Sequence, residues 1–162
     1  MQMITITGKQ ALHGRIRPAA AKNSTLPLLA ATLLCRGPCR LQEVPALADV
    51  TTSLALLQAV GADVQRCGVD LCTRPVQTLC GEIPESLAGA MRSSVFYLAP
   101  LLCRTGYGRL PLPGGCRLGP RPVDIHLAGL AAMGAEVELE GIAVTLRRKG
   151  PLHGVDFTLR LP

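Results

Sequence analysis

Apolar and polar residues follow the same succession of patterns twice along the chain. Residues 54–64 (LALLQAVGADV) and 127–137 (LAGLAAMGAEV) both carry apolar side chains at helical spacing, then a Gly-Ala pair and an acidic residue. Beyond that residue the pattern is typical of a strand. Gly68 and Gly141 fall at matching positions and predict tight turns. Each copy is therefore predicted to contain a helix, a strand, a tight turn and a second strand.

The repeat extends toward the amino terminus. The tetrapeptide LLCR occurs at residues 33–36 and 101–104, where it ends an apolar helix and is followed by glycine and a new strand. The first of these helices is expected to begin near residues 23–24, because Asn and Ser are good N-caps. Alternation over residues 3–7 predicts an additional opening strand. Strands joined through helices to parallel neighbours predict an α/β fold of repeated βαβαββ units.

The two copies differ in the loop before their last helix. Matched positions run from Arg40 to Leu54 in the first copy and from Arg109 to Leu127 in the second, so the second copy is four residues longer there. The extra residues fall in the segment PGGCR at 113–117. Repeated positions are expected to form a scaffold without chemistry of their own. We expect a functional site at the enlarged glycine-rich loop.

Composition indicates an aliphatic core and gives no sign of a membrane segment. Hydrophobic residues make up 48% of the chain, whereas aromatic residues make up 2% and tryptophan is absent. The longest apolar stretch, residues 26–35, is far shorter than the roughly 20 residues that cross a bilayer. No basic segment precedes an apolar run at the start, so no export signal is expected. We expect a cytoplasmic protein without a membrane partner.

The chain has seven cysteines, an odd number without the spacing of zinc ligands. We therefore expect no metal site and reduced thiols, most of them packed as small core residues. That expectation applies to the six cysteines outside the enlarged loop, which are Cys35, Cys39, Cys67, Cys72, Cys80 and Cys103.

The net charge of +6 admits nucleic acid, a membrane surface or an anionic small molecule as a partner. The four aromatic residues are too few and too scattered for a base-stacking platform. The arginines are also dispersed rather than gathered in a basic run. We therefore expect no nucleic-acid partner.

Two expected helix entrances carry a cationic residue. Lys22, followed by Asn23, precedes the first apolar helix, and Arg92 precedes the corresponding helix of the second copy. Free backbone N–H groups and the positive end of the helix dipole attract anions at such a position. Each cation therefore marks a candidate anion site. The alternative is a solvated side chain beside an ordinary helix cap.

The enlarged loop contains a candidate reactive thiol. Two glycines precede Cys116, and Arg117, Arg121 and Asp124 follow it. Glycine lets a ligand approach the backbone, and nearby guanidinium groups make a thiol more reactive. The alternative is that the thiol packs beneath its own loop. Asp124 and His126 suit the first turn of a helix, where they could hold a hydroxyl or a base edge, or simply cap the helix.

These segments together resemble one family. Residues 21–23 (AKN), 91–94 (MRSS) and 113–126 (PGGCRLGPRPVDIH) are similar to the UDP-N-acetylglucosamine enolpyruvyl transferases of peptidoglycan synthesis. The resemblance covers essentially the whole chain. It implies an inside-out α/β barrel made of two similar domains that hold the substrates between them. Residues 1–21 would be a strand segment of the second domain, and residues 22–162 an incomplete first domain of about two repeat units.

The resemblance also implies a reaction and its residues. The enolpyruvyl group of phosphoenolpyruvate would move to the 3-hydroxyl of UDP-N-acetylglucosamine, without a metal or cofactor. Cys116 would donate a proton to the methylene carbon of phosphoenolpyruvate. The residues binding phosphoenolpyruvate would be Lys22, Asn23 and Arg121. Those binding UDP-N-acetylglucosamine would be Asn23, Arg92, Arg121, Pro122, Val123, Asp124 and Ile125.

By the same resemblance, the general base and further phosphate-binding arginines belong to the part of the family that follows Pro162. We therefore expect no turnover by this chain alone, and an exposed half-interface that favours self-association. Two alternatives remain open. One is the shikimate-pathway enolpyruvyl transferase, which is similar in architecture but has no counterpart to the Cys116 loop. The other is a fragment that folds without binding a substrate.

Overall fold

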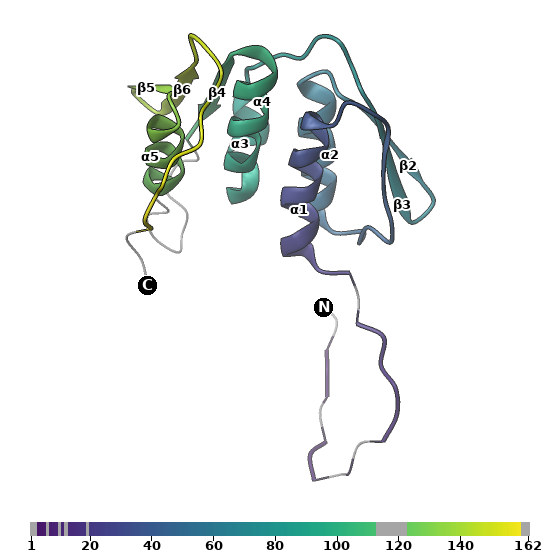
Figure 1. Cartoon of the computed structure of the whole chain (residues 1–162). Coiled ribbons are helices and arrows are strands. Elements are labelled where there is room, and N and C mark those ends of the chain that lie inside the picture. Colours follow the sequence, from purple (N-terminus) through teal and green to yellow (C-terminus); the bar gives the residue numbers. More distant parts are fainter. Residues whose placement is uncertain are drawn as a thin grey trace.

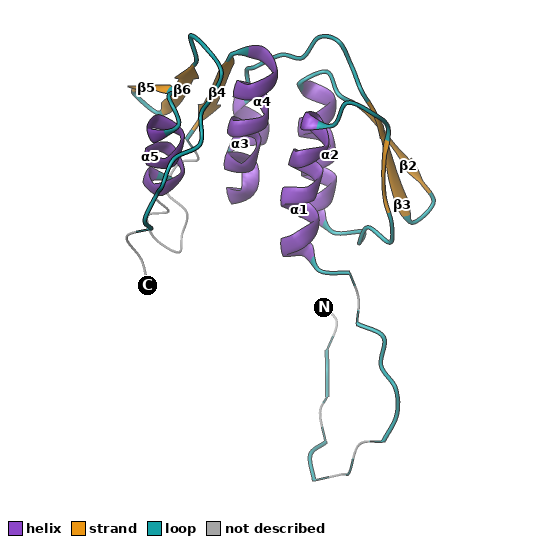
Figure 2. Cartoon of the chain, in the orientation of Figure 1, coloured by secondary structure: helices purple, strands orange, loops and turns teal. Residues whose placement is uncertain are grey.

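The computed structural model describes residues 3–5, 7–9, 11, 13–18, 20–112 and 123–159. Most of the helices lie in the middle of the molecule, and a group of short strands lies on each side of them (Figures 1 and 2). Among the described helices, none combines the length and the apolar character needed to span a bilayer. In chain order the elements, with η for 3-10 helices, are α1 (Lys22–Ala31), η1 (Thr32–Leu34), β1 (Cys39–Leu41), α2 (Ala48–Ala59), β2 (Asp63–Cys67), β3 (Asp70–Arg74), α3 (Glu85–Ala88), η2 (Arg92–Tyr97), α4 (Leu98–Thr105), β4 (Tyr107–Pro111), α5 (Asp124–Ala132), β5 (Glu136–Glu140) and β6 (Ala143–Arg147).

The two sheets have the same strand order, which confirms the internal repeat. The first runs β1-β3-β2 and the second β4-β6-β5, and every neighbouring pair is antiparallel. In each copy the last two strands form a hairpin whose turn begins at Gly68 or Gly141. These glycines have φ of +66° and +57°, a backbone conformation that favours glycine. Each hairpin follows a helix, α2 or α5, as the sequence predicts.

The expectation of parallel neighbouring strands is wrong for these sheets. β1 and β2 run in the same direction, but β3 lies between them and pairs antiparallel with both. The hairpin explains this order, because β3 turns back directly from β2 and leaves its other edge to pair with β1. Among the described residues, parallel pairing occurs at one isolated bridge, between Glu82 and Arg109. The fold is therefore α/β with small antiparallel sheets.

The described amino-terminal residues form no strand in this chain by itself, and the expectation that Asn23 or Ser24 caps the first helix is wrong. Residues 3–5 and 7–9 are exposed and form no strand, because no described strand lies beside them to satisfy their backbone hydrogen bonds. The first helix begins at Lys22, and no side chain caps its N-terminus. Ser24 Oγ instead donates a hydrogen bond to the backbone oxygen of Ala21, at 3.0 Å.

The core is aliphatic, as the composition predicts. Leu29, Leu56 and Leu101, from three different helices, are fully buried in one cluster. Tyr97 is also buried, and its Oη donates a hydrogen bond to the backbone oxygen of Ser53 at 3.3 Å. Burial raises the pKa of Tyr97 to about 12, so the phenol stays neutral. This contact joins η2 in the second repeat to α2 in the first.

The prediction that the cysteines pack in the core is wrong for the six that are described. In the first hairpin, Val64, Leu71 and Thr73 are buried on one face, and the cysteines of both strands fall on the opposite, outer face together with the buried Asp70. Three of the six are exposed, namely Cys67, Cys80 and Cys103. The other three are half-buried, namely Cys35, Cys39 and Cys72.

Candidate functional site

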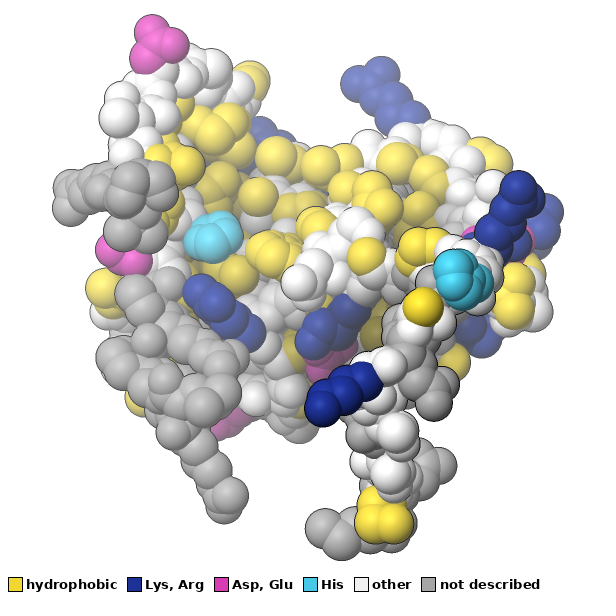
Figure 3. Space-filling view, turned by 90° about the horizontal axis from the view of Figure 1, so that it is seen from below, with side chains coloured by type: hydrophobic (Ala, Val, Ile, Leu, Met, Phe, Trp, Pro, Cys, Tyr) yellow, Lys and Arg dark blue, Asp and Glu magenta, His cyan; other side chains and the backbone are white. Residues whose placement is uncertain are grey.

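A cleft of about 620 Å³ opens where the first turns of several helices meet. We call it the polar cleft. Figure 3 views the molecule from the side onto which these helix ends open, and basic and histidine side chains lie among hydrophobic ones on this face. The lining residues come from both repeats and are Lys22, Asn23, Leu26, Asp49, Ala90, Met91, Arg92, Ser93, Val95, Phe96 and His126.

Lys22 occupies the first position of α1 and is already paired with a carboxylate. Its Nζ lies 2.8 Å from Oδ2 of Asp49, which belongs to the first turn of α2. The first turn of α1 itself holds no acidic residue, and its N-cap Ala21 offers no side-chain oxygen. The N-terminal N–H groups of α1 are therefore not capped by a side chain, and they lie next to Lys22. Such a position favours an anion.

Arg92 begins the corresponding helical segment of the second repeat. It is the first residue of η2, where Ser94 fixes the turn by donating hydrogen bonds to the backbone oxygens of Ala88 and Met91, at 3.1 and 3.0 Å. None of the ion pairs among the described residues includes Arg92. The geometry therefore brings Lys22, Asn23 and Arg92 to one cleft and leaves the guanidinium of Arg92 without a carboxylate partner in this part of the chain.

His126 and Phe96, both from the second repeat, lie together at the edge of the cleft. Their ring centroids are 6.4 Å apart with an interplanar angle of 44°, a separation within the range of tilted aromatic pairs. His126 lies in the first turn of α5, as the sequence predicts, and Phe96 belongs to η2. Both side chains also line a second hollow beside the cleft.

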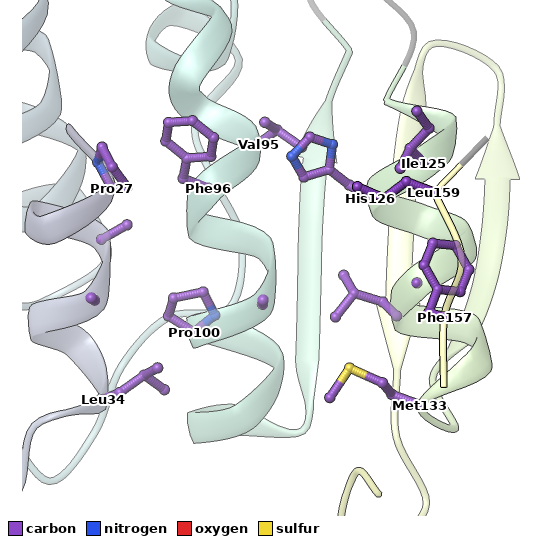
Figure 4. A pocket seen from close by; sticks show the side chains of 15 residues that line it. Pro27, Leu34, Val95, Phe96, Pro100, Ile125, His126, Met133, Phe157 and Leu159 are labelled. Carbon is purple, nitrogen blue, oxygen red and sulfur yellow. The ribbon is translucent and has the colours of Figure 1, made fainter. Parts of the chain in front are cut away.

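This second hollow, which we call the apolar groove, has a volume of about 460 Å³ and lies between α1, α4 and α5. Figure 4 shows side chains from these elements and from the segment near the carboxyl end pointing into it. The groove is lined by Pro27, Ala30, Ala31, Leu34, Val95, Phe96, Ala99, Pro100, Ile125, His126, Gly129, Leu130, Met133, Phe157 and Leu159.

Several predicted site residues do not line the polar cleft. Val123 and Asp124 are in neither hollow, and Ile125 lines the apolar groove instead. Cys116, Arg121 and Pro122 lie outside the described residues. Predictions for these three positions therefore remain predictions.

Asp49 is the cleft residue that sequence reasoning missed. It stands in the first turn of a repeated helix, where an acidic residue is a common helix-stabilising feature. Its pairing with Lys22 depends on how α1 packs on α2, and the local sequence carries no signal of that. Among the described residues, no group of three or more His, Cys, Asp or Glu side chains could hold a metal ion.

Two solved enolpyruvyl transferase structures have a similar arrangement of elements. The enolpyruvyl transferase NikO from Streptomyces tendae matches with a TM-score of 0.71 and 22% identity, over 85% of this chain and 30% of that chain. EPSP synthase from Acinetobacter baumannii matches with a TM-score of 0.67 and 15% identity, over 92% of this chain and 35% of that chain. At these identities the likeness defines the fold, which is that of an enolpyruvyl transferase.

Residues 6–162 match the family described as EPSP synthase (3-phosphoshikimate 1-carboxyvinyltransferase), and the chain belongs to this family. Relatives named UDP-N-acetylglucosamine 1-carboxyvinyltransferase confirm the resemblance seen in the sequence. The relative from Synechocystis sp. is 43% identical over 91% of this chain and 34% of its own length. The one from Cellvibrio japonicus is 41% identical over 98% of this chain and 38% of its own length. The chain thus spans about a third of the length of the curated relatives it matches.

Proposed function

We propose that the chain forms part of a cytoplasmic UDP-N-acetylglucosamine 1-carboxyvinyltransferase. This enzyme would catalyse the first committed step of peptidoglycan synthesis. One observation carries the proposal: Lys22, Asn23 and Arg92, from corresponding helix entrances of two repeats, line one cleft. Relatives of that name at 41–43% identity support the choice of reaction.

The cleft suits two anionic substrates. Lys22 and Arg121 bind the phosphate and carboxylate of phosphoenolpyruvate, with Asn23 beside them. Asn23 and Arg92 contact the sugar nucleotide, whose uridine and diphosphate border residues 121–125. The support for the phosphate site is physical, because an uncapped helix N-terminus next to an ammonium group stabilises a doubly charged anion. The incoming phosphate exchanges with Asp49 as the partner of Lys22.

The reaction is an addition followed by an elimination. Cys116 donates a proton to the methylene carbon of phosphoenolpyruvate, which leaves a cationic carbon stabilised by its oxygen substituent. The 3-hydroxyl of the sugar attacks that carbon and loses its proton to a base. Loss of a methyl proton then expels inorganic phosphate and restores the double bond as an enol ether. Arg121 and Lys22 stabilise the negative charge of the phosphate as it leaves.

The chain holds only some of the groups that this sequence of steps needs. We propose that its two repeats form part of an inside-out α/β barrel, in which residues 1–21 contribute a strand to a second domain. The base for the sugar hydroxyl and further phosphate-binding arginines come from that second domain. Turnover by this chain alone is therefore not expected.

Self-association is a further part of the proposal, with a second copy covering the apolar groove. The support is the chemistry of its lining, which is almost entirely aliphatic or aromatic, and the exposure of Leu34, Phe157 and Leu159 beside it. Analytical ultracentrifugation should give a mass that rises with concentration. Met133→Glu places a charge in the groove and should restore the monomer. A monomer at all concentrations would contradict this part.

The main test is a calorimetric titration of the chain with UDP-N-acetylglucosamine, with and without phosphoenolpyruvate. Arg92→Ala should weaken binding of the sugar nucleotide, and Lys22→Ala should weaken binding of phosphoenolpyruvate. Lys149→Ala is a matched control, because Lys149 pairs with Glu136 and does not line the cleft. Equal effects of all three substitutions, or no binding by the folded parent chain, would overturn the proposal.

A second titration addresses the shikimate-pathway alternative, because the family that the chain matches is described as EPSP synthase. Binding of shikimate 3-phosphate in preference to UDP-N-acetylglucosamine would establish that alternative. Covalent labelling by the epoxide phosphonate fosfomycin separates the two reactions further. We expect one adduct that Cys116→Ser abolishes, because only the UDP-N-acetylglucosamine enzymes have a counterpart to this loop.

A further inference from the structure

The β2–β3 hairpin carries two thiols on its outer face. Cys67 stands opposite Asp70, and Cys72 stands opposite Gln65, so the two cysteines are diagonal neighbours across the strand pair. Cys67 is exposed and Cys72 is half-buried. The hairpin lies at one edge of the molecule, on the outer side of α1 and α2 (Figure 1). Neither cysteine lines that cleft.

The two sulfur atoms are close enough to interact. The neighbouring thiol of Cys67, and then burial, raise the pKa of Cys72. The pair is consequently a dithiol rather than two independent cysteines.

A guanidinium group is fixed next to this dithiol. Arg40 stands directly opposite Cys72 in the register of β1 and β3. Its Nε donates a hydrogen bond to Asp70 Oδ2 at 2.8 Å, and Asp70 Oδ1 accepts one from the backbone N–H of Glu43 at 2.9 Å. The Asp70 side chain is only 9% exposed, so Arg40 is anchored to a well-held carboxylate. The Cys67 thiol and burial raise the pKa of Cys72 more than this guanidinium lowers it.

The spacing disfavours a direct disulfide. Diagonal neighbours in an antiparallel pair have Cα atoms roughly 7–8 Å apart, whereas disulfides span Cα separations up to about 6.8 Å. The strands would have to move to close an S–S bond. An atom inserted between the two sulfurs removes that requirement, because each sulfur then bonds to it separately. Zinc and similar ions need more ligands than the pair supplies.

We infer that Cys67 and Cys72 form a binding site for trivalent arsenicals, the class of soft electrophile that bonds two thiols at once. An aryl arsenous acid exchanges its two As–O bonds for two As–S bonds, and the two hydroxyls leave as water with the thiol protons. No atom changes oxidation state, and no further reactant is needed. Arg40 assists by stabilising the attacking thiolate. The site is separate from the proposed transferase chemistry.

The chain provides internal comparisons for this inference. Cys35 and Cys39 are also neighbours, but both are half-buried, and their thiols donate to backbone oxygens at 3.8 and 3.7 Å. Cys103 is exposed and lies in α4, outside both pairs. Cys35→Ser removes the second pair, which leaves Cys67 and Cys72 as the dithiol under test.

The experiment is intact-mass spectrometry of the full chain with Cys35→Ser, incubated with phenylarsine oxide and excess glutathione. Glutathione removes the reagent from single thiols, whereas the second As–S bond of a dithiol forms within one molecule. Retention should therefore be about 100-fold stronger for the pair than for one thiol. We expect one adduct, lost in Cys67→Ser and in Cys72→Ser and kept in Cys103→Ser.

Two further readouts keep the outcome decisive. Circular dichroism should show that each serine variant keeps its fold, and Arg40→Gln should slow capture without abolishing the adduct. An adduct that survives glutathione in both Cys67→Ser and Cys72→Ser would overturn the inference. So would loss of the adduct in Cys103→Ser. The result does not depend on enolpyruvyl transfer, because neither substrate is present.

Discussion

Replacing Asp49 by Asn should strengthen anion binding in the polar cleft. Lys22 Nζ lies 2.8 Å from Asp49 Oδ2, so an incoming phosphate competes with this carboxylate for the ammonium group. The two side chains are 46% and 37% exposed, and solvent-accessible ion pairs of this kind contribute about 0.2–1 kcal/mol. Removing the competing carboxylate should therefore raise anion affinity by at most roughly fivefold.

Calorimetric titration with phosphoenolpyruvate, and separately with inorganic phosphate, measures this gain. It should shrink at high salt, because exposed charges are screened. Glu136→Gln is the matched control, since Glu136 pairs with Lys149 at 2.6 Å and neither residue lines the cleft. The Asp49→Asn variant should also lose about 0.3–1 kcal/mol of stability in urea, because a carboxylate in the first turn of α2 favours that helix.

Two outcomes would contradict this prediction. A tenfold loss of affinity in folded Asp49→Asn would mean that the carboxylate holds Lys22 in its binding position rather than competing for it. An equal gain in Glu136→Gln would mean that overall charge, and not the pair in the cleft, controls binding. Either result would refute the proposed exchange of partners at Lys22.

Three further predictions concern stability. Tyr97→Phe leaves Ser53 without its phenol partner, so urea titration should show a loss of about 1–3 kcal/mol, and an unchanged midpoint would contradict the assigned bond. Hydrogen bonds from the backbone N–H of Glu43, and then from the Arg40 guanidinium, lower the pKa of Asp70. The ionised Asp70 carboxylate therefore stabilises the folded state fully above the unfolded-state pKa of about 3.9, and this stabilisation is lost as pH falls through the lower folded-state pKa. In Asp70→Asn, the free energy of unfolding should consequently fall less steeply with decreasing pH in acid. Gly81→Ala puts a Cβ 2.6 Å from a backbone oxygen of β4, whereas at Gly89 the nearest such atom is 3.8 Å away, so only the first substitution should lower Tm markedly.

Part of the candidate site followed from the repeat and the family resemblance. The matched helix entrances at Lys22 and Arg92 do meet at one cleft, although their positions lie far apart along the chain. Asp49 was not anticipated, because its ion pair depends on the packing of α1 against α2. The roles assigned to Cys116 and Arg121 remain predictions, since both residues lie outside the described ranges.

The sequence by itself determined the repeated helices and hairpins, because these depend on local periodicity and on glycines at Gly68 and Gly141 that accept a positive φ. Only the tertiary structure decided which elements are neighbours. It placed β3 between β1 and β2, and it put the thiols of Cys67 and Cys72 on the outer face of their hairpin. The reason is that period-two alternation gives a strand two faces without saying which of them the rest of the chain will cover.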